Sequence, residues 1–247
     1  MNTNVAIKPI MERLLQSLEL SLPEEVLVRL EELFHTLLQD PLYPSVSKIF
    51  DPEEIAAKHF LDSLAPLALP ISCWPDRNGI VLDIGCGGGF PSLPLALVFP
   101  DSRVIAIDAK SKAVDFVGRV GKTMGLKNLQ TRHARAEEAG RIPDLREKMD
   151  LVVCRAVAEI RVLLELGLPL VKLGGHLLLY KGPKLEEEMA GVSQAMEKLL
   201  ISPADIRTFT LEPPRLPFRR GFVLIRKTIP TPAAFPRRNG VPSSKPL

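Results

Sequence analysis

The chain has 247 residues, of which 46% are hydrophobic, 5% aromatic and 25% charged, and its formal net charge is +3. This composition is typical of a globular protein with one large core, and it excludes low-complexity and disulfide-dense chains. No charge-free apolar run of about 18 residues and no basic-then-apolar leader is present, so membrane insertion and secretion are not expected. We predict a cytoplasmic protein whose three cysteines (Cys73, Cys86 and Cys154) are free thiols, too widely spaced to hold a metal ion or form a disulfide framework.

The N-terminal part of the chain has the pattern of amphipathic helices. Apolar side chains recur at helical spacing through residues 10–40, and Pro23 marks a second helix start within that range. Asp51 is typical of an N-cap and opens a third helix, which includes His59. We therefore predict that residues 1–70 form a helical cap.

From Ile80 onward, short apolar runs alternate with helical patterns, which predicts a mostly parallel, seven-stranded sheet of the Rossmann-like α/β class. The predicted strands are residues 80–84, 103–108, 129–133, 150–154, 175–180, 205–211 and 221–227. The predicted helices between them are residues 91–99, 111–124, 159–172 and 184–200. No helix separates the last two strands, so we expect them to form an antiparallel hairpin at one edge. Residues 71–229 are the predicted main domain.

The turn between the first of these strands and the first helix is rich in glycine. Gly85, Gly87 and Gly89 alternate there, and residues without Cβ atoms allow a ligand to lie against the backbone at the helix N-terminus. Phe90 stands where a dinucleotide-binding motif has its third glycine, which favours S-adenosylmethionine over a nicotinamide cofactor. Asp83, near the strand end, suits the cationic amino group of a methionine moiety. A tight structural turn is the alternative.

Asp108 supports the cofactor interpretation. It ends the second predicted strand and follows Gly85 by the roughly 20 residues expected of a ribose-binding carboxylate. Taken by itself, Asp108 would be assigned as the N-cap of the helix that begins near Ser111. The combination with the glycine turn favours the ribose.

Basic residues are concentrated at the C-terminal end. Residues 213–247 contain eight Lys or Arg and no acid, whereas residues 1–212 have 24 basic and 29 acidic side chains. The many prolines predict an extended tail over residues 230–247 whose guanidinium groups can follow a polyphosphate backbone. Deleting this tail should then weaken RNA binding and leave cofactor affinity unchanged. A solvated tail that aids solubility is the alternative.

Several short motifs occur in order over about residues 50–247: KHFLDSL at 58–64, DIGCGGGFPSLP at 83–94, RAE at 135–137, CRAVA at 154–158, YKG at 180–182 and FPRRNG at 235–240. Together they resemble the bacterial ribosomal RNA small-subunit methyltransferase G family. The resemblance implies a methyltransferase that transfers a methyl group from S-adenosylmethionine to N7 of one guanine in small-subunit (16S) ribosomal RNA. The implied partner is that RNA or the ribosomal subunit, and we expect a monomer.

The glycine turn and the resemblance together give a predicted cofactor site: Gly85, Gly87, Gly89, Phe90, Asp108, Ala136, Glu137 and Arg155. The resemblance places Phe90 beside the cofactor, Ala136 and Glu137 around the adenine, and Arg155 against the cofactor or the incoming nucleotide. Alternative roles are ordinary core packing for Phe90, a helix-start carboxylate for Glu137 and a surface ion pair for Arg155.

No catalytic acid or base is predicted. Guanine N7 has a lone pair and no proton, so methylation there needs in-line approach and exclusion of water. Binding of RNA needs stacking surfaces and cations instead. The candidates are His59, Tyr180, Lys181, Arg219, Arg220, Arg237 and Arg238. For His59, simple packing on its helix is the alternative.

Other functions remain open from the sequence. Cys154, at the end of the fourth predicted strand, is placed where enzymes that methylate cytosine C5 have their nucleophile. A nicotinamide dehydrogenase and a non-catalytic RNA-binding module are the remaining alternatives.

Overall fold

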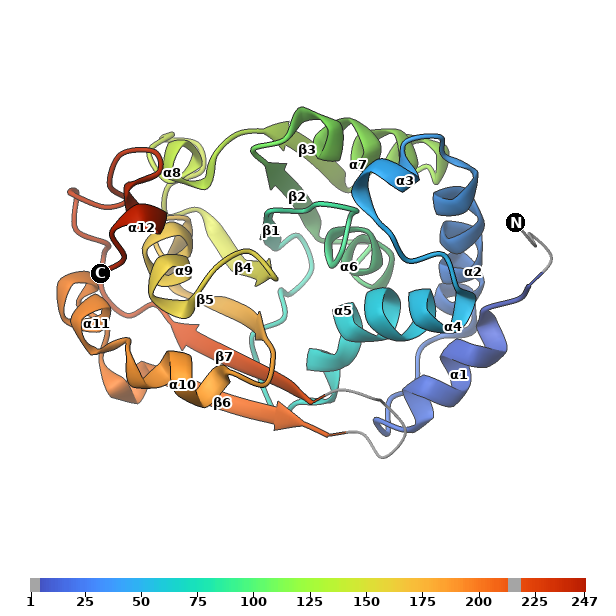
Figure 1. Cartoon of the computed structure of the whole chain (residues 1–247), viewed down its shortest axis with the longest axis horizontal. Coiled ribbons are helices and arrows are strands. Elements are labelled where there is room, and N and C mark those ends of the chain that lie inside the picture. The colour runs from blue at the N-terminus through green and yellow to red at the C-terminus, as the bar shows by residue number, and fades with distance from the viewer. Residues whose placement is uncertain (1–4, 213–218) are drawn as a thin grey trace.

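The computed structural model describes residues 5–212 and 219–247, and Figure 1 shows a central sheet between two groups of helices. The strand order is β3-β2-β1-β4-β5-β7-β6. The strands are β1 (Ile80–Ile84), β2 (Arg103–Asp108), β3 (Leu129–His133), β4 (Met149–Arg155), β5 (Val171–Lys181), β6 (Ile206–Leu211) and β7 (Arg220–Arg226). The pairs from β3 to β5 are parallel, and β7 pairs antiparallel with both β5 and β6. The predicted Rossmann-like sheet with an antiparallel edge hairpin is confirmed.

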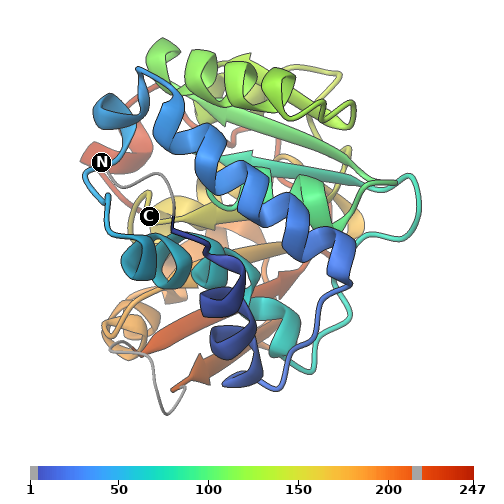
Figure 2. The same ribbon diagram turned by 90° about the vertical axis from the view of Figure 1, so that its right-hand side faces the viewer.

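One face of the sheet is covered by the N-terminal helices together with α6 and α7, as Figure 2 shows for α1 and α2. These helices are α1 (Lys8–Gln16), α2 (Glu24–Gln39), α3 (Tyr43–Val46), α4 (Pro52–Ile55), α5 (Asp62–Leu64), α6 (Ser92–Val98) and α7 (Ser111–Thr123). The third predicted helix begins after Asp51, whose side chain accepts a hydrogen bond from Glu54 N. It then widens into a π-helical turn, Ala56–Leu61, which contains His59. Such turns occur often at functional sites.

The opposite face is covered by α8 (Ala136–Ala139), α9 (Ile160–Gly167), α10 (Leu185–Ala190), α11 (Ser193–Leu199) and α12 (Val241–Ser244). The predicted helix over 184–200 is two helices, because Gly191 and Val192 break it. The predicted helix over 159–172 ends earlier, since β5 already begins at Val171.

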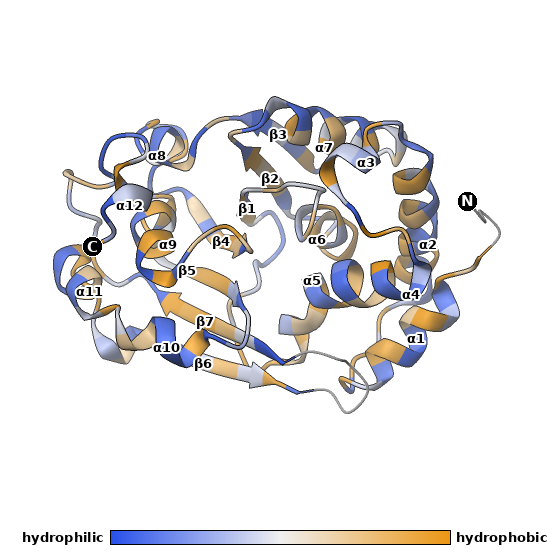
Figure 3. Ribbon diagram, in the orientation of Figure 1, coloured by the Kyte–Doolittle hydropathy of each residue, from blue (hydrophilic) through white to orange (hydrophobic). Residues whose placement is uncertain are grey.

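Apolar side chains alternate between two cores because neighbouring strand residues point to opposite faces. Val81 and Val153 share the first core with Phe34 of α2 and Phe60 of the π-helical turn, so the helical cap packs directly on the sheet. Leu82 and Val152 point into the second core. Figure 3 shows this pattern as hydrophobic strands with polar outer surfaces on the helices. Burial of one such Val, Leu or Phe side chain stabilises the folded state by about 1.5–3 kcal/mol.

The C-terminal segment does not extend away from the protein. Leu247 is 4% exposed and belongs to the second core. The side chain of Arg237 forms an ion pair with Glu165. The prediction of an extended tail with available guanidinium groups is therefore wrong for Arg237, because apolar packing and ion pairing outweigh the local preference of proline for extended chain. No helix among the described residues is long and apolar enough to cross a bilayer.

Candidate active site

The glycine turn lies between β1 and α6 at the carboxyl end of the sheet. Gly85, Gly87 and Gly89 have φ angles of +75°, +50° and +88°, which L side chains rarely adopt. A Cβ atom at Gly89 would lie 2.3 Å from Leu93 Cδ1, and one at Gly85 would lie 2.8 Å from Val157 Cγ2. Gly87 differs, because the nearest atom that its Cβ would meet in the described part of the chain is Gly85 O, at 3.9 Å. Internal packing explains two of the glycines, whereas Gly87 leaves open space for a ligand.

Asp108 ends β2 with its carboxylate directed at this turn. Its Oδ2 accepts a hydrogen bond from Gly87 N at 3.0 Å, and its Oδ1 accepts one from Lys110 N at 2.8 Å. The N-cap of α7 is Lys110, so the alternative role of Asp108 as that N-cap is wrong. Asp108 instead fixes the turn, and its remaining lone pairs suit the hydroxyl donors of a ribose.

Asp83 adds a buried, incompletely paired carboxylate beneath the turn. It is fully buried, and its Oδ2 accepts hydrogen bonds from Ser92 N and from the Ser92 hydroxyl. Its Oδ1 has no hydrogen-bond partner among the described residues. Burial raises the pKa of Asp83 to about 6. An unpaired buried acceptor beside an open glycine turn fits the ammonium group of a methionine moiety.

Cofactor binding should therefore depend on pH through Asp83. The ionised carboxylate attracts an ammonium group and the protonated form does not, so affinity for S-adenosylmethionine should rise as the pH increases through about 6. Asp83→Asn cannot ionise and should remove most of this dependence. Calorimetric titration below and above that pH tests it, and the same pH dependence in the variant would contradict the assignment.

The pH dependence of stability is a less direct test of Asp83, because Asp83 and His59 change the free energy of unfolding in opposite directions. Between about pH 4 and 6, folded Asp83 keeps a proton that the unfolded chain releases, so this group lowers stability as the pH rises. Burial lowers the pKa of His59 to about 4. Between about pH 4 and 6.5 the unfolded chain therefore holds a proton on His59 that the folded chain does not. His59 thus raises stability as the pH rises through the range in which Asp83 lowers it.

Phe90 and His59 connect the turn to the helical cap. Their rings stack with centroids 4.5 Å apart, and Phe90 is only 4% exposed. The Nε2 atom of His59 lies 3.0 Å from the Ser47 hydroxyl. With its lowered pKa, His59 is neutral at pH 7. Packing thus covers the Phe90 ring, whereas His59 is only partly buried.

Arg155 ends β4 and contacts both the turn and the cap. Its Nε donates to Phe90 O at 3.3 Å, and its Nη1 donates to Lys58 O at 2.9 Å. Asp62 accepts two hydrogen bonds: its Oδ2 accepts one from Arg155 Nη1 at 2.8 Å, and its Oδ1 accepts one from Arg220 Nε at 2.5 Å. The Asp62 side chain is 5% exposed, so the alternative of a surface ion pair for Arg155 is wrong. Sequence reasoning did not predict the role of Asp62, although the HFLDSL motif contains it.

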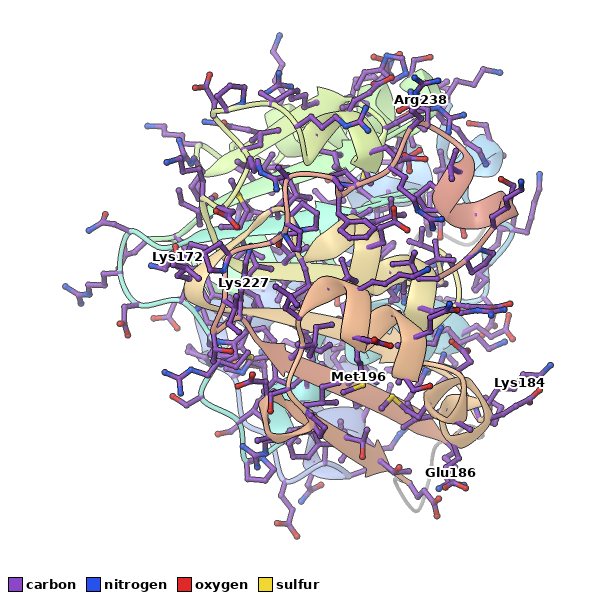
Figure 4. All side chains as sticks on the ribbon, turned by 90° about the vertical axis from the view of Figure 1, so that its left-hand side faces the viewer. Lys172, Lys184, Glu186, Met196, Lys227 and Arg238 are labelled. Carbon is purple, nitrogen blue, oxygen red and sulfur yellow. The ribbon has the colours of Figure 1, made fainter. Side chains whose placement is uncertain are left out.

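A cleft of about 880 Å³ opens beside this cluster. Its lining includes five of the predicted RNA-binding or cofactor residues: His59, Arg155, Tyr180, Lys181 and Arg220. Tyr180 is 4% exposed and donates its hydroxyl to Ser63 O, so its ring is largely covered. Lys181 pairs with Glu188 at 2.7 Å. Lys184 also lines the cleft, and Figure 4 shows its side chain pointing away from the ribbon.

The remaining predicted residues lie outside the cleft. Arg219 is exposed and pairs with Glu186 and Glu212. Arg237 donates to Lys245 O just after α12, and Figure 4 labels Arg238 at the surface near α12. Ala136 and Glu137 belong to α8 and are 8% and 5% exposed. Helix α8 follows β3, and Ala134 N donates to Asp108 O at 3.1 Å, which ties this connection to the end of β2.

Cys154 is fully buried, and burial raises the pKa of its thiol well above the ordinary value. A protonated thiol inside the second core cannot attack a base. Cys154→Ala should therefore retain methyl transfer within about twofold, measured with labelled cofactor and RNA. Complete loss in a folded variant would restore the cytosine C5 alternative. Within residues 5–212 and 219–247, no group of three His, Cys, Asp or Glu side chains is placed to hold a metal ion.

Comparison with known proteins adds to this geometry. The family model described as rRNA small subunit methyltransferase G matches residues 42–215. A protein of that name from Lactobacillus delbrueckii subsp. bulgaricus is 39% identical over 87% of this chain and 88% of its own length. Its counterpart from Desulforamulus reducens is 38% identical over 94% and 95%.

Among solved structures, a SAM-dependent methyltransferase from Aquifex aeolicus superposes with a TM-score of 0.52 at 21% identity, over 74% of this chain and 97% of that one. This likeness confirms the fold class. The family model covers most of the chain, and the relatives match it nearly from end to end. The chain therefore belongs to the rRNA small subunit methyltransferase G family.

Proposed function

We propose that this protein transfers a methyl group from S-adenosylmethionine to N7 of a guanine in small-subunit ribosomal RNA. The family and the names of its members support the enzyme class and the RNA. The observation that carries the chemistry is the open glycine turn above Asp83, next to a cleft lined with cations. When bound, the cofactor supplies an electrophilic methyl group on a sulfonium centre.

Three carboxylates hold the cofactor in this proposal. Asp83 Oδ1 receives the ammonium group, and Asp108 accepts from the ribose while keeping Gly87 in place. Ala136 and Glu137, beyond β3, flank the adenine. These groups lie at the carboxyl ends of adjacent strands, where open α/β sheets bind their ligands.

The target nucleotide occupies the cleft on the other side of Arg155. The strand order changes direction between β1 and β4, and Arg155 at the end of β4 separates the glycine turn from the cleft. Arginine and lysine donors suit the phosphate and the O6 acceptor of guanine. The N7 lone pair attacks without losing a proton, so the protein supplies orientation and water exclusion. Neutral His59 contributes packing beside Phe90.

Transfer of a labelled methyl group tests this proposal. Small-subunit RNA, free or within the subunit, is taken from cells that lack the activity and incubated with the protein and labelled cofactor. Reduction and aniline cleavage then cut the RNA at 7-methylguanosine, and we expect one such cut. Label on another base would change the assigned position, and RNA binding without transfer would support the non-catalytic module.

We further propose a cytoplasmic monomer, which should elute near 27.3 kDa on a calibrated sizing column.

A further inference from the structure

The C-terminal segment is fastened to the protein by hydrogen bonds that leave little freedom for residues 231–237. Arg146 donates from Nη1 to Phe235 O at 2.8 Å and from Nη2 to Thr231 O at 3.0 Å. Arg141 Nη2 donates to Pro236 O at 2.8 Å. These arginines lie in the connection between α8 and β4, so the segment is attached beside α8 (Figure 1).

Two adjacent arginines in this segment have different surroundings. Arg237 donates from Nε to Glu165 Oε1 at 2.8 Å and from Nη2 to Glu165 Oε2 at 2.6 Å, and the Glu165 side chain is 0% exposed. Such bidentate pairing is what a buried carboxylate requires. The side chain of Arg238 is exposed and has no hydrogen bond or ion pair with any described residue, and Figure 4 labels it at the surface near α12.

The residues that follow Arg237 reach the two acidic side chains of α8. Gly240 N donates to Glu137 Oε1 at 2.8 Å, and Asn239 Nδ2 donates to Glu138 Oε1 at 2.6 Å. The φ angle of Gly240 is +79°, in the left-handed region that favours glycine. On the same side, a Cβ atom at Gly140 would lie 3.0 Å from Pro236 Cγ, so helix and segment are in close contact.

We propose that residues 235–240 form a clasp that fixes α8 and thereby the adenine side of the cofactor site, with Arg237 as its positioning residue. This inference rests on the proposed cofactor site, because α8 is tied to Asp108 through Ala134. It reverses the expectation that removing the tail leaves cofactor affinity unchanged. The clasp also gives the two arginines different roles: Arg237 holds the clasp, and Arg238 remains exposed for RNA.

Affinity for S-adenosylhomocysteine, measured by calorimetry, tests the clasp. Arg237→Ala should weaken binding roughly fivefold or more, the scale of a typical coupling between sites. Arg237→Lys should restore part of it, and Arg238→Ala should bind like the wild type. Arg237→Ala leaves the buried Glu165 carboxylate without its arginine. The double variant Glu165→Gln/Arg237→Ala removes that negative charge and provides a second test. Wild-type affinity in both folded Arg237→Ala variants would overturn the clasp.

Hydrogen exchange in the wild-type chain provides a readout that a purely structural role would not change. If the clasp favours cofactor binding, the cofactor must favour the closed clasp by the same factor. The Gly240 amide should therefore exchange more slowly with S-adenosylhomocysteine present, whereas the Ala204 amide, bonded to Ser202 Oγ near β6, should not change. Unchanged exchange at Gly240 with ligand bound would overturn the inference alone. Failure of the wild type to bind the ligand would overturn the proposed function as well.

Discussion

Replacing Gly87 with alanine should weaken S-adenosylmethionine binding at least tenfold. Among the described residues, the nearest atom to the added methyl group is 3.9 Å away, so the methyl group projects into the space that the cofactor is proposed to fill. The φ angle of +50° adds strain of about 1–2 kcal/mol, which lowers stability without explaining a loss of affinity in the folded variant. Calorimetry and chemical unfolding separate the two effects.

Gly125→Ala is the matched control for this substitution. Gly125 has a φ angle of +65° and equally open surroundings, but it lies in the turn after α7, far from the glycine turn in the sequence. Its replacement should cost a similar stability and leave cofactor affinity unchanged. Equal affinities in the two variants would show that the space above Gly87 does not receive the cofactor.

Removing the Asp62 carboxylate should produce the largest combined loss of stability and activity. Asp62 joins Arg155 to Arg220, and its side chain is only 5% exposed. Asp62→Ala leaves both guanidinium groups without their shared carboxylate, which should destabilise the fold by about 3 kcal/mol. Arg155 then keeps its bonds to Phe90 O and Lys58 O but loses the carboxylate that fixes it on the side of the cleft. Methyl transfer, assayed where the variant is still folded, should fall on the order of a hundredfold.

An exposed ion pair in the same helical cap provides the comparison. Arg13 and Glu53 pair at 2.6 Å, but their side chains are 50% and 55% exposed. Glu53→Ala should therefore change stability by less than about 1 kcal/mol and leave methyl transfer intact. An Asp62→Ala variant that resembles Glu53→Ala in both measurements would show that Asp62 does not organise the cleft.

The strands were predictable because their signal is local. Three of the predicted ranges match the observed strands β1, β2 and β3, and three more, for β4, β6 and β7, differ from the observed strands by one residue at one end or at both. Helices α8 and α12 were not predicted, because four residues are too few to show a helical period. Strand β5 begins earlier than predicted. Its pairing register with β4 shifts between Met149 and Leu151, and this irregularity interrupts the alternation of apolar side chains in the first residues of β5.

The site was predictable only where its contacts are close in the sequence. The glycine turn and Asp108 are linked by a bond across 21 residues within one strand-helix-strand unit, a spacing that the sequence displays. The Asp62–Arg155 bond spans 93 residues, and the Glu165–Arg237 bond spans 72. No local pattern encodes such pairs. For that reason Arg237 was predicted to contact RNA, although a buried carboxylate of α9 holds it.

Titration of the wild-type protein with S-adenosylhomocysteine in a calorimeter tests the central claim most directly. We predict saturable binding of one ligand per chain, weakened at least tenfold in the Gly87→Ala variant and retained in Gly125→Ala, with no heat of binding from NADH. Absence of binding by the folded wild-type chain, or equal binding by both glycine variants, would contradict the assignment of the glycine turn as the cofactor site.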